Sequence, residues 1–296
     1  MHGLGAGHGL AGLGRSVDAL AGSLTLLTLT SRHYPKYEDE ETAEEEEEAF
    51  QRNLAGALSC LSRLTALRSL GIDWGCMRRL EAVGATLRAL TGLTRLALDN
   101  TPISLAEVEV LSSLPSLAEV TFSWAWADDS DAPDMAACPP CASVTRLHCG
   151  VTVPHLGGLM ALFPAVAKAE VWVIGDADAD EDEDEDEASR EAPPPLAARW
   201  ADLRDLDLSS NRAAPAFALL RSLAPLQLRR LKLTTRPYEL ELYDDALAAL
   251  LQMAPHLERL SISSSALTQA AIVFFKFPQI CFHFPRRAQK THQKQT

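Results

Sequence analysis

Residues 203–211 read Leu-Arg-Asp-Leu-Asp-Leu-Ser-Ser-Asn, with leucine at positions 203, 206 and 208 and asparagine at position 211. Residues 93–103 repeat this arrangement, with leucine at 93, 96 and 98, threonine at 101 and isoleucine at 103. Alternate side chains of a strand point to opposite faces of a sheet, so the last two leucines of each stretch share one face. Each stretch therefore predicts a short strand with one buried face and one exposed face.

The same apolar pattern returns nine times along the chain. Its copies start at Leu24, Leu67, Leu93, Leu117, Val144, Val166, Leu203, Leu228 and Leu257. All 27 core positions of these copies are apolar and 18 of them are leucine, and most copies lie 22 to 29 residues apart. The segments 49–65 and 242–253, between copies, have apolar residues three and four apart, which predicts helices. A unit of this size cannot bury its own apolar face, so the sequence predicts a solenoid of stacked strand-and-helix units.

The two longest steps between copies each contain a run of acidic residues. Glu38–Glu48 contains nine acids and Asp176–Glu187 contains ten. Like charges in such runs repel one another, and the runs offer almost no apolar side chains to a core. We therefore expect disordered acidic inserts near residues 35–48 and 175–195, in connections between strands.

The nine copies resemble the leucine-rich-repeat family over about residues 20–275, and within it the ribonuclease-inhibitor-like branch. The resemblance implies an α/β solenoid of about nine irregular repeats, with a curved parallel sheet, helices on the convex side and partner binding on the concave face. The chain departs from the family at the asparagine position, which only Asn211 retains. In the family that asparagine binds backbone groups of adjacent turns, so its loss predicts a less regular solenoid whose buried backbone groups need other partners.

The net charge of −13 is concentrated in the two acidic runs. Without them the chain has 21 acidic and 27 basic residues, and five of the basic residues lie in the last 21 positions. The remaining body is therefore nearly neutral. A nucleic-acid partner is not expected, because binding along a phosphate backbone needs a basic face.

The apolar stretches and the cysteines indicate in which cellular compartment the protein is expected. The apolar stretch 270–275 is far shorter than the roughly 20 residues that a membrane span needs. The six cysteines follow no secretory signal, which favours a reducing compartment. We expect a cytoplasmic protein with no membrane partner, with a flexible glycine-rich leader at 1–19 and a basic, unstructured tail at 276–296.

The residues between the core positions are predicted to line the concave face. Arg230, Lys232 and Arg259 then lie on two neighbouring strands, beside Asp205 and Asp207 on the preceding strand. Opposite charges in one patch favour an oriented protein partner, so we interpret these five residues as a binding surface. The alternative is an ordinary solvated face whose charges pair with one another, because exposed pairs contribute little.

Trp74 and Trp124 occupy the same position, just past the third core residue, in two copies of the repeat. An exposed tryptophan can anchor a binding partner. The structural alternative, which we favour, is that the two amphipathic rings cover the rim of the sheet.

Cys138 and Cys141, followed by His148 and Cys149, have a spacing that could hold a zinc ion. The strand pattern argues against this, because His148 and Cys149 are adjacent in a predicted strand and point to opposite faces. Cys149 also takes a core position of its repeat. We therefore interpret these cysteines as buried or loop residues and expect no metal.

No arrangement of nucleophile, histidine and carboxylate stands out, and the glycine-rich start lacks the context of a phosphate loop. We therefore expect a protein-binding scaffold that is not an enzyme, with no cofactor and no small-molecule substrate. The composition, rich in alanine, leucine and arginine with acidic inserts, is similar to that of leucine-rich-repeat proteins of ciliated green algae, which implies a cytoskeletal or axonemal setting. The alternative is substrate recognition in a ubiquitin ligase, although no F-box-like pattern is visible before Leu24.

Overall fold

The computed structural model describes residues 17, 19–30, 56, 58–73, 83–99, 105–122, 138–152, 156–174, 200–210, 220, 227–235, 256–264 and 280–282. The strands of these residues form one parallel sheet in which the spatial order follows the chain order. The ten strands are β1 (Leu26–Thr30), β2 (Ser69–Asp73), β3 (Arg95–Asp99), β4 (Glu119–Phe122), β5 (Arg146–Thr152), β6 (Lys168–Ile174), β7 (Asp205–Ser210), β8 (Arg230–Thr235), β9 (Arg259–Ser264) and β10 (Ile280–Phe282). Parallel neighbours need a return segment between them, so each repeat contributes one strand and one return path.

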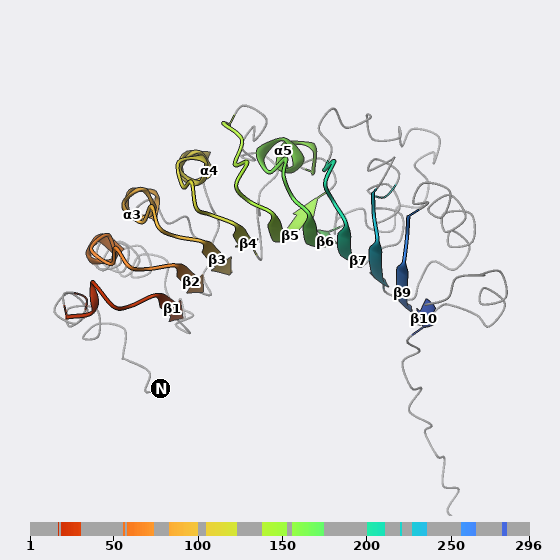
Figure 1. Cartoon of the computed structure of the whole chain (residues 1–296), viewed down its shortest axis with the longest axis horizontal. Helices are drawn as coiled ribbons and strands as arrows, with labels where there is room; N and C mark the ends of the chain where they lie inside the picture. Colours follow the sequence, from red (N-terminus) through yellow and green to blue (C-terminus); the bar gives the residue numbers. More distant parts are fainter. Residues whose placement is uncertain are drawn as a thin grey trace, which may run out of the picture.

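The sheet follows the inner side of an arch, and the described helices follow the outer side (Figure 1). These helices are α3 (Val83–Ala89), α4 (Leu105–Ser112) and α5 (Leu156–Leu162). Packed helices need about 8–10 Å between their axes, whereas neighbouring strands need only about 4.8 Å. The helical side of each repeat is therefore the wider one, and stacking bends the sheet so that its uncovered face is concave. The predicted solenoid with a curved parallel sheet and helices on the convex side is confirmed.

The hydrophobic core lies between the sheet and the return segments. The core positions of the second to ninth copies are buried wherever their side chains are described. The three core leucines of the first copy, Leu24, Leu27 and Leu29, are partly buried and pack against the same core. Full burial of one leucine side chain contributes about 1.5–3 kcal/mol, so the repeated leucines dominate the stability of the stack.

Helices α3 and α5 bury one face each, with the spacing that a helix requires. In α3 the buried residues include Val83, Thr86 and Leu87, and in α5 they include Leu156 and Leu159. Residues three and four apart lie on one side of a helix, so each helix turns a single apolar stripe toward the sheet. Residues 58–61 are also helical, within the helix predicted at 49–65, while the helix predicted at 242–253 lies outside the described residues.

A backbone ladder joins the repeats at the start of every strand from β2 to β9. The amides of Arg68 and Ser69 both donate to the carbonyl of Thr25, at 2.8 and 3.0 Å. The corresponding pair of amides in each later repeat donates to the equivalent carbonyl of the repeat before it, as far as Glu258 and Arg259 on Arg229. The stack is therefore regular at this edge, although the asparagine expected of the family is missing from most copies.

The structure differs from the sequence prediction at the C-terminal end of the sheet. β10 lies in the segment 276–296, which the sequence assigned to an unstructured tail, and it pairs in parallel with residues Leu260 to Ile262 of β9. Its three residues are too few to show the repeat pattern, so periodicity alone does not find it. The predicted leader at 1–19 is described only at its last residues, and both acidic inserts lie outside the described residues.

Candidate functional site

Two rows of side chains cross the concave face from strand to strand. The first row runs through Leu26, Ser69, Arg95, Glu119, Arg146, Lys168, Asp205, Arg230 and Arg259. The second row, two residues later on each strand, runs through Thr28, Gly71, Ala97, Thr121, His148, Glu170, Asp207, Lys232 and Ser261. Both rows match the predicted concave positions. The register is strongly specified, because a shift of one residue would turn the core leucines toward the open face of the sheet.

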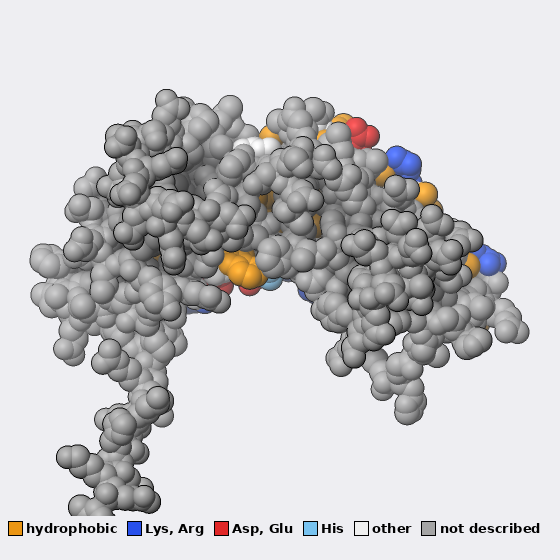
Figure 2. Space-filling model, turned by 180° about the vertical axis from the view of Figure 1, so that it is seen from behind, with side chains coloured by type: hydrophobic (Ala, Val, Ile, Leu, Met, Phe, Trp, Pro, Cys, Tyr) orange, Lys and Arg blue, Asp and Glu red, His pale blue; other side chains and the backbone are white. Residues whose placement is uncertain are grey.

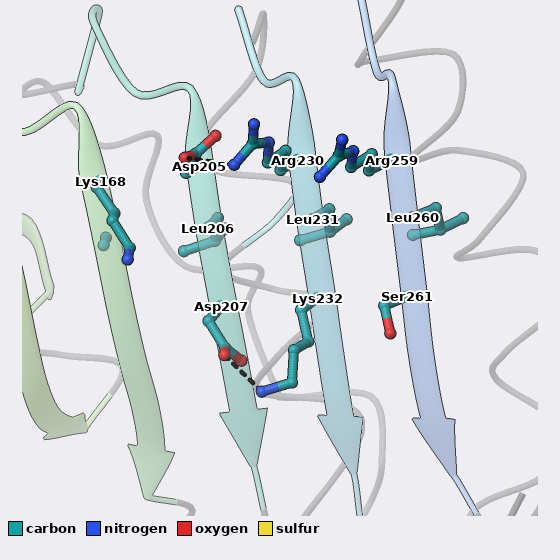
Figure 3. A pocket seen from close by; sticks show the side chains of 11 residues that line it. Lys168, Asp205, Leu206, Asp207, Arg230, Leu231, Lys232, Arg259, Leu260 and Ser261 are labelled. Carbon is teal, nitrogen blue, oxygen red and sulfur yellow. Dashed lines mark hydrogen bonds and ion pairs between the residues drawn. The ribbon is translucent and has the colours of Figure 1, made fainter. Parts of the chain in front are cut away.

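The β7–β9 patch, formed by Asp205, Asp207, Arg230, Lys232 and Arg259, comes together as the sequence predicts (Figure 3). Lys232 Nζ donates to Asp207 Oδ2 at 2.6 Å, and Arg230 Nη1 lies 3.7 Å from Asp205 Oδ2. Both ion pairs join β7 to β8 at directly paired positions. The two cations are each 55% exposed, against 34% for Asp205 and 25% for Asp207, so the basic groups project further from the sheet.

The patch borders a shallow groove of about 440 Å³ over strands β6 to β9. Lys168 on β6 and Ser261 on β9 complete its polar lining (Figure 3). The core leucines of these strands, such as Leu206 and Leu231, are buried, so the floor of the groove is the sheet itself. An open groove of this kind can accept an extended chain lying on the sheet.

Further ion pairs continue along the concave face toward the N-terminal strands. Glu119 on β4 lies between two cations, with Arg95 Nε at 3.2 Å from Oε1 and Arg146 Nη1 at 3.8 Å from Oε2. His148 Nδ1 lies 3.5 Å from Glu170 Oε2. Charged side chains of the described strands are visible along the inner margin of the arch (Figure 2). Because each exposed pair contributes only about 0–1 kcal/mol, a partner can exchange these pairs for its own at little cost.

Trp172 on β6 is an aromatic residue of the concave face that was not among the predicted binding residues. It follows Glu170 by two positions, lies in register with Gly150 and Ser209, and is 42% exposed. The alternation along β6 was the signal that could have found it, since residues 168, 170 and 172 share a face. Trp74 and Trp124, the tryptophans that the sequence singled out, both lie outside the described residues.

Cys138, Cys141 and Cys149 are buried in the core, apart from the concave surface. His148 is exposed on the concave face, whereas Cys149 beside it is fully buried on the core side. Burial raises the pKa of Cys149 to about 12, and burial together with the neighbouring Cys138 raises the pKa of Cys141 to about 12. Both thiols are therefore protonated at neutral pH. Within the described ranges, no three histidine, cysteine or acidic residues are grouped closely enough to hold a metal ion.

No helix in the described parts of the chain is both long and apolar enough to cross a membrane.

No protein-family model matches the sequence, and no curated protein is detectably similar to it. Among solved structures, the crystal structure of an internalin from Listeria monocytogenes strain 4b F2365 is similar to this chain, at 14% sequence identity and a TM-score of 0.43. The alignment covers 92% of this chain, which spans 66% of the length of that internalin. The register and burial described above show a solenoid of stacked strand-and-helix repeats with buried leucines and an open, charged concave face.

Proposed function

We propose that this protein is a non-catalytic scaffold that binds a partner protein in the concave face of its solenoid. The observation that carries the proposal is the groove over β6 to β9, whose lining combines acidic and basic side chains in fixed register. Complementary charges of this kind orient a partner and accelerate its association. The rigid stack of strands holds the charges in place before the partner arrives, which lowers the entropic cost of binding.

The groove favours binding over catalysis because it is shallow and open to water. Catalytic acids and bases work in enclosed sites, where partial desolvation tunes their proton affinity. Arg230 and Lys232 are instead more than half exposed, and their carboxylate partners form ordinary surface ion pairs. A partner would desolvate these groups on binding, so the charges gain strength only in the complex.

We further propose that the scaffold belongs to a cytoskeletal or axonemal assembly. It is supported by composition alone, through the similarity to leucine-rich-repeat proteins of ciliated green algae. A role in substrate recognition for a ubiquitin ligase would use the same face, so the identity of the partner distinguishes the two settings.

Proximity labelling in the source cell tests the scaffold. The intact chain would be compared with the double variant Arg230→Glu and Arg259→Glu, and with the matched control Arg63→Glu and Arg88→Glu. The control changes the net charge equally at exposed residues outside the sheet, one of them on α3. We expect a set of labelled proteins that is lost in the first variant and kept in the control.

The same labelled set in all three chains would rule out the β7–β9 patch as the binding surface. Cytoskeletal proteins in the lost set would support the axonemal setting, and ubiquitin-ligase subunits there would replace it with the adaptor role.

A further inference from the structure

The charges of the first row alternate in sign along much of the sheet, but the alternation fails at two places. Arg146 on β5 is paired in register with Lys168 on β6. Arg230 on β8 is paired in register with Arg259 on β9. Each place sets two cations side by side at the distance of neighbouring strands, about 4.8 Å between backbones, where like charges destabilise a sheet.

Each of these two cation pairs carries positive charge that the row does not neutralise. Arg146 and Arg230 each lie near a carboxylate on one side, but Lys168 and Arg259 form no ion pair with any side chain in the described ranges. The guanidinium of Arg259 extends toward Arg230 rather than toward an acid (Figure 3). An anion placed between the members of either pair would relieve the repulsion and gain two charge-assisted hydrogen bonds.

The distance between the two cation pairs matches an extended peptide. The middle of the first pair and the middle of the second are three strand spacings apart, or about 14 Å. In an extended chain, residues i and i+4 lie on the same side and are also about 14 Å apart, at about 3.4 Å for each residue. Two acidic residues four positions apart therefore reach both cation pairs at once.

Asp205 lies midway between the cation pairs and determines the residue in the middle of the peptide. β7 stands between β6 and β8, so Asp205 faces residue i+2 of a chain that runs across the strands. A third acid at that point would be repelled, whereas a lysine or arginine would pair with Asp205. The row therefore discriminates against a uniformly acidic chain as well as against a basic one.

We propose that the concave face binds an extended segment of a partner protein with the pattern acidic, any, basic, any, acidic, lying across strands β5 to β9. The first acid binds between Arg146 and Lys168, the basic residue binds Asp205, and the second acid binds between Arg230 and Arg259. This inference rests on the proposed function, that the concave face binds protein, and adds the chemistry of the partner.

A nucleic acid fits the row less well than this peptide. Its backbone carries a negative charge at every nucleotide, so it would place phosphates against Asp205 and over the acids of the second row, Glu170 and Asp207. An alternating peptide avoids this repulsion because only two of its five residues are acidic.

Selection from an unbiased library of displayed 12-residue peptides tests the proposal. The full chain would be immobilised at low salt, beside the variant Lys168→Glu and Arg259→Glu and the net-charge control Arg63→Glu and Arg88→Glu, with circular dichroism confirming that each is folded. We expect the intact chain and the control to enrich the acidic, any, basic, any, acidic pattern. The first variant should lose this enrichment.

Synthetic peptides then measure the spacing requirement by fluorescence anisotropy. A peptide containing Glu-Thr-Lys-Thr-Glu should bind at least about tenfold more tightly than its isomer Glu-Glu-Lys-Thr-Thr, which has the same charge and composition. Equal binding of the two peptides, or binding of a single-stranded oligonucleotide as tight as that of the first peptide, would overturn the proposal in favour of diffuse attraction to anions.

The selection also separates this inference from the proposed function. Enriched peptides that depend on Lys168 and Arg259 but lack the pattern would refute the inference and leave the scaffold intact. No enrichment dependent on the concave face would count against both.

Discussion

Leu206 and Asp207 are neighbours in the chain, but their side chains face opposite sides of the sheet. Leu206 is 2% exposed and faces the core, whereas Asp207 faces the concave groove and accepts a hydrogen bond from Lys232. The pleat of β7 alone separates the two environments, so the effect of a substitution depends on which face of the strand it occupies. The same contrast holds for Leu231 beside Arg230 and Lys232 on β8.

Substitutions at these neighbouring positions should differ sharply in their cost. We expect Leu206→Ala to lower the free energy of unfolding by about 2–5 kcal/mol, because it removes buried methyl groups and leaves a cavity. Asp207→Asn should lower it by less than about 1 kcal/mol, because the lost ion pair is exposed. Chemical denaturation followed by circular dichroism measures both. Equal losses would mean that the register of β7 differs from the one described.

The buried thiols predict how stability depends on alkaline pH. The pKa of Cys149 rises from its ordinary value of 9.0 to about 12 in the folded chain. Below pH 9 the thiol is protonated in both the folded and the unfolded state, so the stability is fully present there. Between pH 9 and about 12 only the unfolded state releases the proton, so the free energy of unfolding falls as pH rises.

The variant Cys149→Ala should show a shallower fall of stability over this pH window than the intact chain. Thiol labelling at pH 8 gives a second readout, in which Cys149 reacts only after denaturant is added. Rapid labelling of Cys149 in the folded chain would contradict its burial.

At the scale of single elements, hydroxyl side chains at the end of β7 and on α3 link neighbouring repeats inside the core. Ser210 Oγ, on the core side of the strand, donates to the carbonyl of Val173 on β6 at 3.1 Å. Thr86 on α3 acts similarly, since its Oγ1 donates to the carbonyl of Leu58 in the repeat before it at 2.9 Å. Short hydroxyl side chains therefore link neighbouring repeats inside the core.

Ser209 and Ser210 form a matched pair for testing this link. Ser210→Ala should lower the free energy of unfolding by about 1–3 kcal/mol, because it leaves a buried carbonyl short of a donor. Ser209→Ala, on the concave side of the same strand, should change it by no more than about 0.5 kcal/mol. Thermal and chemical unfolding would measure the two variants side by side. A larger effect of Ser209→Ala would mean that the hydroxyl on the concave side, and not the one in the core, stabilises the strand.

For the whole molecule, stability comes from contacts between successive repeats, so the ends of the stack are its weakest points. Each repeat of a solenoid contacts only its neighbours, and an uncovered terminal strand offers free backbone groups to other chains. β10 covers the outer edge of β9 by parallel pairing. The short segment 280–282 therefore pairs with residues 260–262 at this edge of the sheet.

Two truncations test the role of β10. A chain ending at residue 275 loses this strand, whereas a chain ending at residue 284 keeps it. We expect the shorter chain to unfold at a lower temperature and to associate as its concentration rises, while the longer one behaves as the full chain does. Light scattering and thermal unfolding provide the comparison, and identical behaviour of both truncations would show that the stack ends functionally at β9.

The repeat, the register and the two concave rows follow from the local residue pattern. Leucines at a strict spacing can be buried together in only one register, and each strand then assigns its remaining residues to the open face. The sequence therefore placed Asp205, Arg230 and Arg259 side by side, and it predicted the bipolar patch. It also indicated that Cys149 faces the core, away from His148.

Features that depend on contacts between repeats arise when the chain folds. The backbone ladder, the hydroxyl links in the core and the pairing of β10 involve residues 20 to 44 positions apart, and no local pattern specifies them. The shape of the groove and the ion-pair distances along it also depend on how neighbouring strands stack. Periodicity reports which face of a strand is buried and which residues share a row, but the distances between side chains of different repeats are fixed only when the repeats stack.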